Sequence, residues 1–164
     1  IHSAREDAQC VLHTHTKAGC AVAAQEGGLL PVNQISMEFY GRVGYHDYEG
    51  IALDFSEQQR LVADLGDNSV MILRNHGLLT VGDSVKQAFL RMYYLEKACE
   101  IQIAAQAGGQ LHLPPEEVRV RTERQFNAPG QGVAEGELSD LDAVDFAWAA
   151  LLRMLDRVAP DYKN

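Results

Sequence analysis

The chain has 164 residues, of which 46% are hydrophobic and 23% charged, with a formal net charge of −9 at pH 7. These values are typical of one globular domain with a real core, and no apolar run approaches the roughly 20 residues that span a bilayer. The acidic balance argues against a nucleic-acid partner, whose phosphates would be repelled. With no signal peptide visible, we expect a cytoplasmic protein that has no membrane partner.

The cysteines and the first residue of the chain each lead to one further expectation. Cys10, Cys20 and Cys99 form no C-x-x-C pair and lie in apolar stretches, so we expect buried free thiols. The chain begins with Ile1 rather than methionine and reaches its richest motif at His13. We therefore expect functional residues upstream of Ile1.

The first part of the chain alternates short helical and extended patterns. In chain order these are a helix end at 2–8, an apolar strand at 9–13, a helix over 16–28 that ends at two glycines, an extended piece at 29–32, one or two helical turns at 34–42, and a strand within 41–50. Ser56 and Gln59 have capping-box spacing, which predicts a helix through Leu65 that ends at Gly66.

The second part holds the strongest periodic signals. Val70 to Leu73 are four consecutive apolar residues, which predicts a central strand covered on both faces, and 78–81 predicts a second strand paired with it through a turn. Ser84 and Gln87 form another capping box, which opens the longest helix and leads to Gly108 and Gly109. Its apolar stripe is Val85, Ala88, Phe89, Met92, Leu95, Cys99 and Ile103.

A polar, glycine-containing linker (127–140) precedes a last helix over about 140–158. We predict one domain at 1–129, with 130–164 as linker and helix packed on that domain or on a neighbouring subunit. Strands and helices alternate, which favours a layered α/β domain.

His13 and His15 follow an apolar strand with one residue between them. Side chains at i and i+2 of a strand point to the same face, roughly 6.6 Å apart along the chain, so both imidazoles can reach one metal ion. The alternative is that both lie at the exposed end of the strand and hydrogen-bond to loops, which is the commoner arrangement for an isolated H-x-H.

A third histidine changes this balance. His76 stands between Asn75 and Gly77, directly after the most buried strand, where binding residues collect and glycine allows close backbone approach. Three histidines from two strand ends would form a facial set with open positions, as in catalytic metal sites. His46 is a competing candidate, which we interpret as a turn histidine hydrogen-bonded to Asp47. His2 and His112 have no supporting context.

The motifs HTHTKAG, YHDYEG, LRNHGLLTVGDSVKQAF and LEKACEIQIAAQAGG together resemble the class II aldolase/adducin family over residues 1 to 109, most closely its adducin-like branch. The resemblance implies a three-layer α/β/α sandwich with a largely antiparallel central sheet, assembled as a homotetramer. It also implies a divalent metal, zinc first and manganese or iron next, bound by His13, His15 and His76.

The family's acid–base glutamate would lie upstream of Ile1. The family's aldolases also carry a tyrosine four residues after the proline equivalent to Pro31, where Ile35 stands in this chain, and Tyr40 is the candidate to replace it. The candidate neighbours of the substrate are Asn75, Gly77, Tyr40 and His46.

Three functions are compatible with these residues. The first is a metal-dependent lyase, which cleaves a C–C bond of a small hydroxy-carbonyl or carboxylate substrate, as an aldolase or decarboxylase does, through an enolate that the metal stabilises. The second is an oligomerisation module without catalysis, like the head of adducin. The third is an Fe(II)-dependent oxygenase or decarboxylase on the same scaffold.

Overall fold

The computed structural model describes residues 1–51, 56–127 and 140–163, with side chains from 144 onward in the last range. The chain divides into two compact units, Ile1–Asn127 and Ala128–Asn164. The domain boundary predicted after residue 129 lies outside the described residues and stays a prediction.

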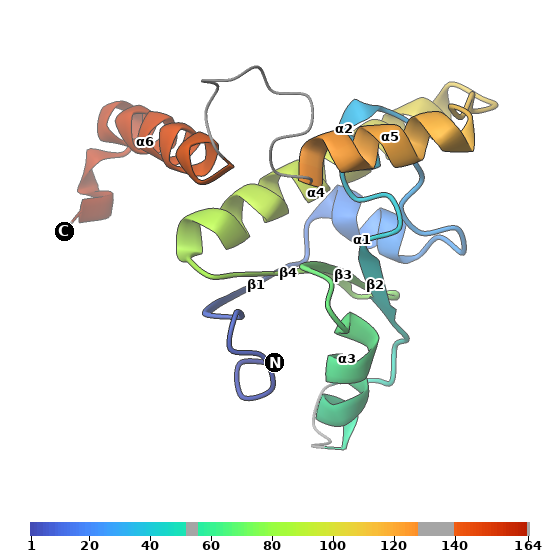
Figure 1. Cartoon of the computed structure of the whole chain (residues 1–164), viewed down its shortest axis with the longest axis horizontal. Coiled ribbons are helices and arrows are strands. Elements are labelled where there is room, and N and C mark those ends of the chain that lie inside the picture. The colour runs from blue at the N-terminus through green and yellow to red at the C-terminus, as the bar shows by residue number, and fades with distance from the viewer. Residues whose placement is uncertain (52–55, 128–139, 164) are drawn as a thin grey trace. The chain divides into compact units, whose positions relative to one another are not determined.

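A mixed four-stranded sheet forms the centre of the first unit (Figure 1). Its strands are β1 (Cys10–Thr14), β2 (Val43–His46), β3 (Val70–Leu73) and β4 (Gly77–Gly82), in the order β1-β4-β3-β2. β4 pairs antiparallel with both β1 and β3, whereas β2 runs parallel to β3. The predicted pairing of 70–73 with 78–81 through a turn is confirmed.

Helices cover both faces of this sheet. The first unit contains α1 (Lys17–Ala23), α2 (Gln34–Met37), α3 (Glu57–Leu65), α4 (Val85–Ala107) and α5 (Glu116–Asn127). α1, α2, α4 and α5 lie on one side of the sheet, and α3 lies on the other side with the N-terminal segment (Figure 1). The predicted three-layer α/β/α architecture is confirmed.

β3 shows why this strand has no polar face. Val70 and Ile72 pack with Leu95 of α4 on one side of the sheet, and Met71 and Leu73 pack with Leu65 of α3 on the other. All four strand residues are buried. Full burial of each such side chain stabilises the fold by roughly 1.5–3 kcal/mol, so both layers depend on this strand.

The ends of two helices differ from the predicted caps. Ser56 forms no capping hydrogen bond with its side chain, because its backbone is already helical (φ −67°, ψ −26°) and an N-cap needs an extended conformation. The predicted box there is wrong. At α4 the hydroxyl of Ser84 accepts from the N–H of Gln87 as predicted, while Gln87 accepts from Asp83, one residue earlier than a reciprocal box requires.

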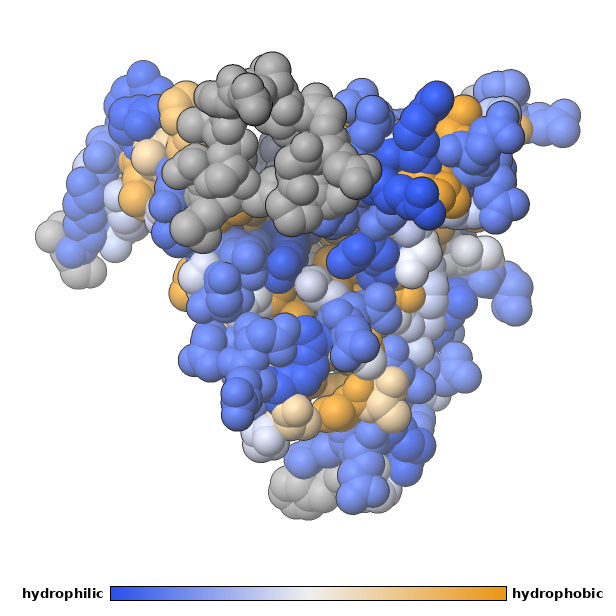
Figure 2. All heavy atoms as spheres, in the orientation of Figure 1, coloured by the Kyte–Doolittle hydropathy of each residue, from blue (hydrophilic) through white to orange (hydrophobic). Residues whose placement is uncertain are grey.

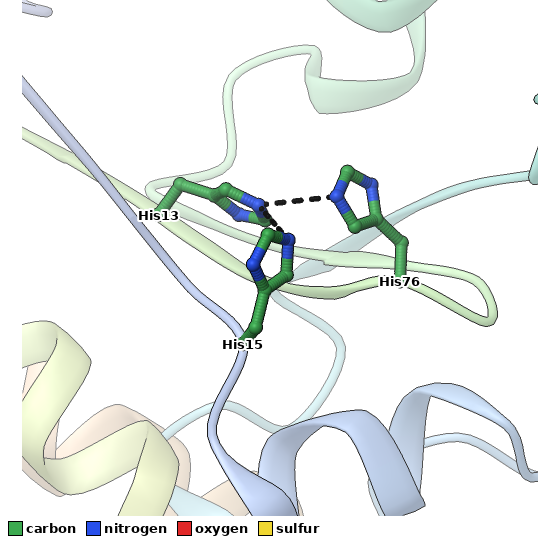
Figure 3. A group of neighbouring side chains, drawn as sticks. All are labelled: His13, His15 and His76. Carbon is green, nitrogen blue, oxygen red and sulfur yellow. Dashed lines mark hydrogen bonds between the residues drawn. The ribbon is translucent and has the colours of Figure 1, made fainter. Parts of the chain in front are cut away.

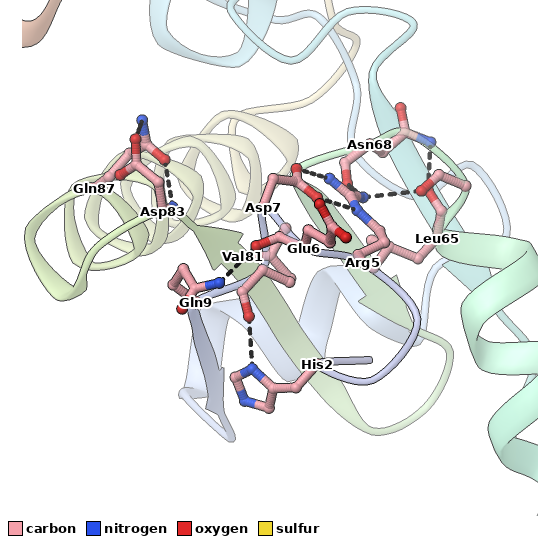
Figure 4. Close-up of polar contacts among 12 residues, drawn as sticks. His2, Arg5, Glu6, Asp7, Gln9, Leu65, Asn68, Val81, Asp83 and Gln87 are labelled. Atoms are coloured by element: carbon pink, nitrogen blue, oxygen red, sulfur yellow. Dashed lines mark hydrogen bonds and ion pairs between the residues drawn. The ribbon is translucent and has the colours of Figure 1, made fainter.

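The N-terminal segment is a series of turns and not the predicted end of a helix over 2–8. Arg5 accounts for the difference, because its guanidinium pairs with Asp7 and donates to the carbonyl oxygens of Gly66 (2.8 Å) and Asn68 (2.6 Å) (Figure 4). These bonds tie the segment to the loop that follows α3. These contacts with a distant part of the chain take the place of the predicted helix end.

The cysteines and the apolar stripe of α4 only partly follow expectation. All three thiols are free, but Cys99 alone is buried, whereas Cys10 and Cys20 are half-buried. Burial raises the pKa of Cys99 to about 12, so this thiol stays protonated. On α4, Val85 (60% exposed) and Phe89 (37% exposed) face outward, so the buried stripe begins at Ala88.

The second unit is described by α6 (Asp140–Val158) and a short 3-10 helix at Pro160–Lys163. α6 confirms the predicted last helix, and Phe146, Met154 and Val158 are exposed on it. What this helix packs against stays a prediction. Among the described residues, no helix is both long and apolar enough to cross a bilayer. The face shown in Figure 2 is mainly hydrophilic, with scattered apolar patches.

Candidate metal centre

The three candidate histidines converge at one end of the sheet (Figure 3). His13 lies on β1, His15 follows the end of that strand, and His76 lies in the turn between β3 and β4. The Nε2 atom of His13 is 2.8 Å from Nε2 of His15 and 3.3 Å from Nε2 of His76. His13 and His15 are exposed, and His76 is half-buried. The structure therefore brings together the residues that the H-x-H and N-H-G motifs indicated.

The pairing of β1 with β4 orients the first of these rings. His13 is opposite Leu79 in the ladder, and its Nδ1 atom lies 2.8 Å from the carbonyl oxygen of Leu78. A carbonyl only accepts, so Nδ1 carries the proton and Nε2 keeps its lone pair. Such a second hydrogen bond fixes the tautomer of a metal-binding histidine.

Helix α1 holds the other two histidine-bearing segments together. It begins directly after His15 and Thr16, and its end meets the turn that carries His76. The N–H of Asn75 donates to the carbonyl of Ala23 (3.0 Å), and the thiol of Cys20 donates to the carbonyl of His76 (3.0 Å). Asn75 adopts a left-handed backbone (φ 56°), which allows this turn to fold back onto the helix.

Gly77 allows the two strand ends to approach each other. A Cβ atom at this position would lie 2.3 Å from the carbonyl oxygen of Thr14, 3.2 Å from Cδ2 of His15 and 3.3 Å from Cε1 of His13. No side chain fits in that space. The glycine that the sequence placed after His76 is therefore a requirement of close packing between β4 and β1.

The electrostatic surroundings of His76 favour its neutral form. Burial lowers the pKa of His76, and the nearby rings of His13 and His15 lower it further, against a smaller opposite effect of Glu57. A neutral ring offers a lone pair to a metal ion, whereas an imidazolium does not. His76 is thus prepared as a ligand at neutral pH.

The donor set also fits a divalent ion. Three ligand nitrogens lie within 4.8 Å of one another. Nitrogen ligands of a tetrahedral zinc ion, at about 2.0–2.1 Å from the metal, are separated by about 3.3 Å. The His13–His76 separation of 3.3 Å matches this value, and the His13–His15 separation of 2.8 Å needs only a small opening. Three imidazoles leave a fourth position for water or substrate.

A pocket of about 430 Å³ lies beside the cluster, lined by Ala23, Ala24, Gln25, Glu26, Asp47, Tyr48, Arg74 and Asn75. Its volume is within the range of small-molecule sites. The ring of Tyr48 is 6.3 Å from that of His76 and nearly perpendicular to it. Sequence reasoning did not select Tyr48, although it belongs to YHDYEG. Asn75 also lines this pocket, and its role as a neighbour of the substrate stays a prediction.

His46 does not belong to the cluster, and the predicted bond to Asp47 is wrong. It is the last residue of β2 and only 4% exposed. Its Nδ1 atom lies 2.7 Å from Asp64, and its Nε2 atom lies 3.3 Å from Glu57. The strand directs the ring inward against α3, whereas Asp47 is exposed.

Tyr40 is likewise not part of the histidine cluster in this chain. It lines a separate pocket of about 150 Å³ with residues such as Pro31 and Phe39, and the guanidinium of Arg119 lies 5.8 Å from its ring centre. Because the family's tyrosine reaches the site of a neighbouring subunit, the role of Tyr40 as its substitute stays a prediction.

Comparison with known proteins agrees with this geometry. The family model for the class II aldolase and adducin N-terminal domain matches residues 1–103. A protein of Pseudomonas aeruginosa, named provisionally as an aldolase class 2 protein, is 43% identical over all of this chain and 61% of its own length. Rat alpha-adducin is 40% identical over 96% of this chain and 22% of its own. The bacterial relatives are thus more similar than the adducins, contrary to the expected adducin-like branch.

Two solved structures extend the comparison. The crystal structure of an aldolase II superfamily protein from Pseudomonas syringae has a TM-score of 0.89 and 55% identity, over all of this chain and 62% of that one. L-fuculose 1-phosphate aldolase from Glaciozyma antarctica has a TM-score of 0.73 and 27% identity, over 98% of this chain and 57% of that one. The chain thus spans about three fifths of the length of its bacterial relatives. With its family match, fold and histidine cluster taken together, this chain belongs to the class II aldolase and adducin N-terminal domain family.

Proposed function

We propose that this chain is the metal-binding part of a class II aldolase-type lyase, which cleaves a C–C bond of a small hydroxy-carbonyl or carboxylate substrate. The observation that carries the proposal is the convergence of His13, His15 and His76 from two strand ends, with the ring of His13 oriented by Leu78. The names of the bacterial relatives and of the Glaciozyma aldolase support the reaction class.

The residues of this chain would have distinct roles in that reaction. The three histidines hold a divalent ion, for which zinc is the first expectation, with manganese or iron as alternatives. That ion, when bound, supplies Lewis-acid stabilisation of the negative charge that develops on a substrate oxygen. Asn75 and Tyr48 line the pocket into which the rest of a substrate would extend. The acid–base glutamate expected upstream of Ile1 stays a prediction.

One observation favours a second candidate, a non-catalytic assembly module. Alpha-adducin is 40% identical to nearly the whole chain, so this degree of similarity does not separate enzymes from adducins. In such a module the three histidines would bind no ion, and replacing them would not change the module's function. Metal content therefore distinguishes the two functions.

The test is metal content by inductively coupled plasma mass spectrometry on protein purified without a histidine tag. We expect near-stoichiometric zinc, manganese or iron in the wild type, and its loss in a His13→Ala/His15→Ala variant. His112→Ala is the matched control, because this histidine is exposed and far in sequence from the cluster. A wild type that holds no metal and takes up none of the three ions would refute the lyase and favour the assembly module.

A further inference from the structure

The most unusual polar group outside the cluster is the side chain of His46, which is almost fully buried between two carboxylates. Its two ring nitrogens face Asp64 at 2.7 Å and Glu57 at 3.3 Å. The Glu57 side chain is 18% exposed and that of Asp64 is 43% exposed. A buried polar group with a partner on each side is costly to assemble and therefore invites a functional explanation.

The two carboxylates belong to opposite ends of one helix. Glu57 is the first residue of α3, and Asp64 is next to its last residue, Leu65. A single imidazole at the end of β2 therefore fastens both ends of α3 to the sheet. Gly44 of β2 brings the two elements into backbone contact, since a Cβ atom there would lie 2.8 Å from the carbonyl oxygen of Asp64.

The backbone of the same residue continues toward the histidine cluster. In the parallel pairing of β2 with β3, His46 is opposite Leu73, and its carbonyl accepts from the N–H of Arg74 at 2.8 Å. Arg74 opens the turn that carries His76, and its guanidinium donates to the carbonyl of Gln25 at the end of α1 (2.7 Å). The end of β2 is thus part of the support of that turn.

The segment after His46 also reaches the cluster. Tyr48, two residues further on, lies against the ring of His76 at 6.3 Å and lines the pocket with Asp47. The position of this aromatic wall of the pocket therefore depends on where the end of β2 places the segment.

We propose that His46 is a positioning residue for the three-histidine centre, which acts by clamping α3 and the Asp47–Tyr48 segment against the turn that carries His76. It touches neither substrate nor metal. The inference rests on the proposed metal-binding function. Residues that support metal ligands from outside the coordination sphere change metal affinity by about 10–100-fold when they are mutated, and an indirect support belongs at the low end of this range.

The test is a titration of metal-free protein with Co(II), whose visible absorption reports the geometry of its ligands. We expect His46→Ala to bind Co(II) about tenfold more weakly than wild type and with an altered spectrum. His46→Gln keeps one hydrogen-bond donor to a carboxylate and should recover part of the affinity. His112→Ala, exposed and outside both sites, should behave as wild type. Thermal unfolding of each metal-free variant shows whether the fold is kept.

His46→Ala with the affinity and spectrum of wild type would overturn the inference, even if its unfolding temperature fell, because the clamp would then be structural only. If that variant does not fold, Asp64→Asn replaces it, since this side chain is half-exposed. A smaller loss of Co(II) affinity would then support the inference, and none would refute it. A wild type that binds no Co(II) would instead defeat the proposed function, so the two failures are separate.

Discussion

Gly77→Ala is the sharpest test of how the two strand ends form the cluster. The added Cβ atom would lie 2.3 Å from the carbonyl oxygen of Thr14, about 1.1 Å short of the 3.4 Å at which ordinary contact begins. The obstacle is backbone, so β1 itself must move by about 1 Å. Thr14 lies between His13 and His15, and both rings would be displaced relative to His76 by a similar amount.

A shift of this size exceeds what a metal site tolerates, since ligand distances must stay within about 0.2 Å of their ideal values. We expect Co(II) or zinc affinity to fall by at least tenfold, in the range of about 10–100-fold known for disturbed metal sites. Overpacking should also cost about 1–3 kcal/mol of unfolding free energy, measured by urea denaturation of the metal-free protein.

Gly27→Ala is the matched control, because a Cβ atom there meets only the end of the Leu30 side chain at 3.4 Å. This variant should keep both the metal affinity and the stability of wild type. A Gly77→Ala protein with wild-type affinity would show that the histidines are not held by the close contact of β1 and β4, and the reasoning would be wrong.

Two further predictions concern buried polar groups away from the cluster. Burial raises the pKa of Glu38 to about 7, and the positive charge of Arg91 acts in the opposite direction. Between about pH 4.5 and 7 the folded state therefore binds more protons than the unfolded state. The stability of the fold consequently decreases as the pH rises through this range. Glu38→Gln should therefore be more stable than wild type above pH 7, by up to about 3 kcal/mol, and equal to it near pH 4; parallel stability–pH curves would refute this. Gln102, fully buried, accepts from the N–H of Leu30 and donates to the carbonyl of Gly28. Gln102→Met leaves both backbone groups unpaired and should lower the unfolding free energy by about 1–3 kcal/mol in urea denaturation, whereas a change below about 0.5 kcal/mol would contradict the assignment.

The layers of the fold could be predicted from local patterns of apolar residues in the sequence. The unbroken apolar run Val70–Leu73 predicted a strand covered on both faces, and the two apolar clusters on either side of it confirm this. The caps were less predictable, because Ser56 has the right residue type but a backbone that is already helical, and no local pattern reports that angle. The helix end expected before β1 does not form, because Arg5 donates hydrogen bonds to carbonyl oxygens more than sixty positions away in the sequence.

The same distinction applies to the candidate site, where some residues could be chosen from local sequence patterns and others depend on contacts between distant segments. His13 and His15 could be chosen because their spacing within a strand has a geometric meaning, and His76 because it follows the most buried strand. His46 was misjudged because its partners, Glu57 and Asp64, are set by the packing of α3 on β2. Tyr48 was missed for the same reason, since its approach to His76 depends on where a turn crosses a strand end.

Hydrogen bonding separates a metal centre from three histidines that merely lie together. Because Nδ1 of His13 donates to Leu78, its Nε2 atom has one lone pair and no proton. Without an ion, His15 and His76 must both place a proton on Nε2 and share that lone pair, at 2.8 and 3.3 Å. With an ion bound by the three Nε2 atoms, His15 and His76 would lose their Nε2 protons, and both of these rings would change tautomer. Nitrogen NMR of the imidazoles, before and after zinc, should therefore show a change at His15 and His76, while the Nδ1 proton of His13 stays in place. If His13 also changed tautomer, its bond to Leu78 would not be what orients the cluster, and the support for a prearranged metal site would be lost.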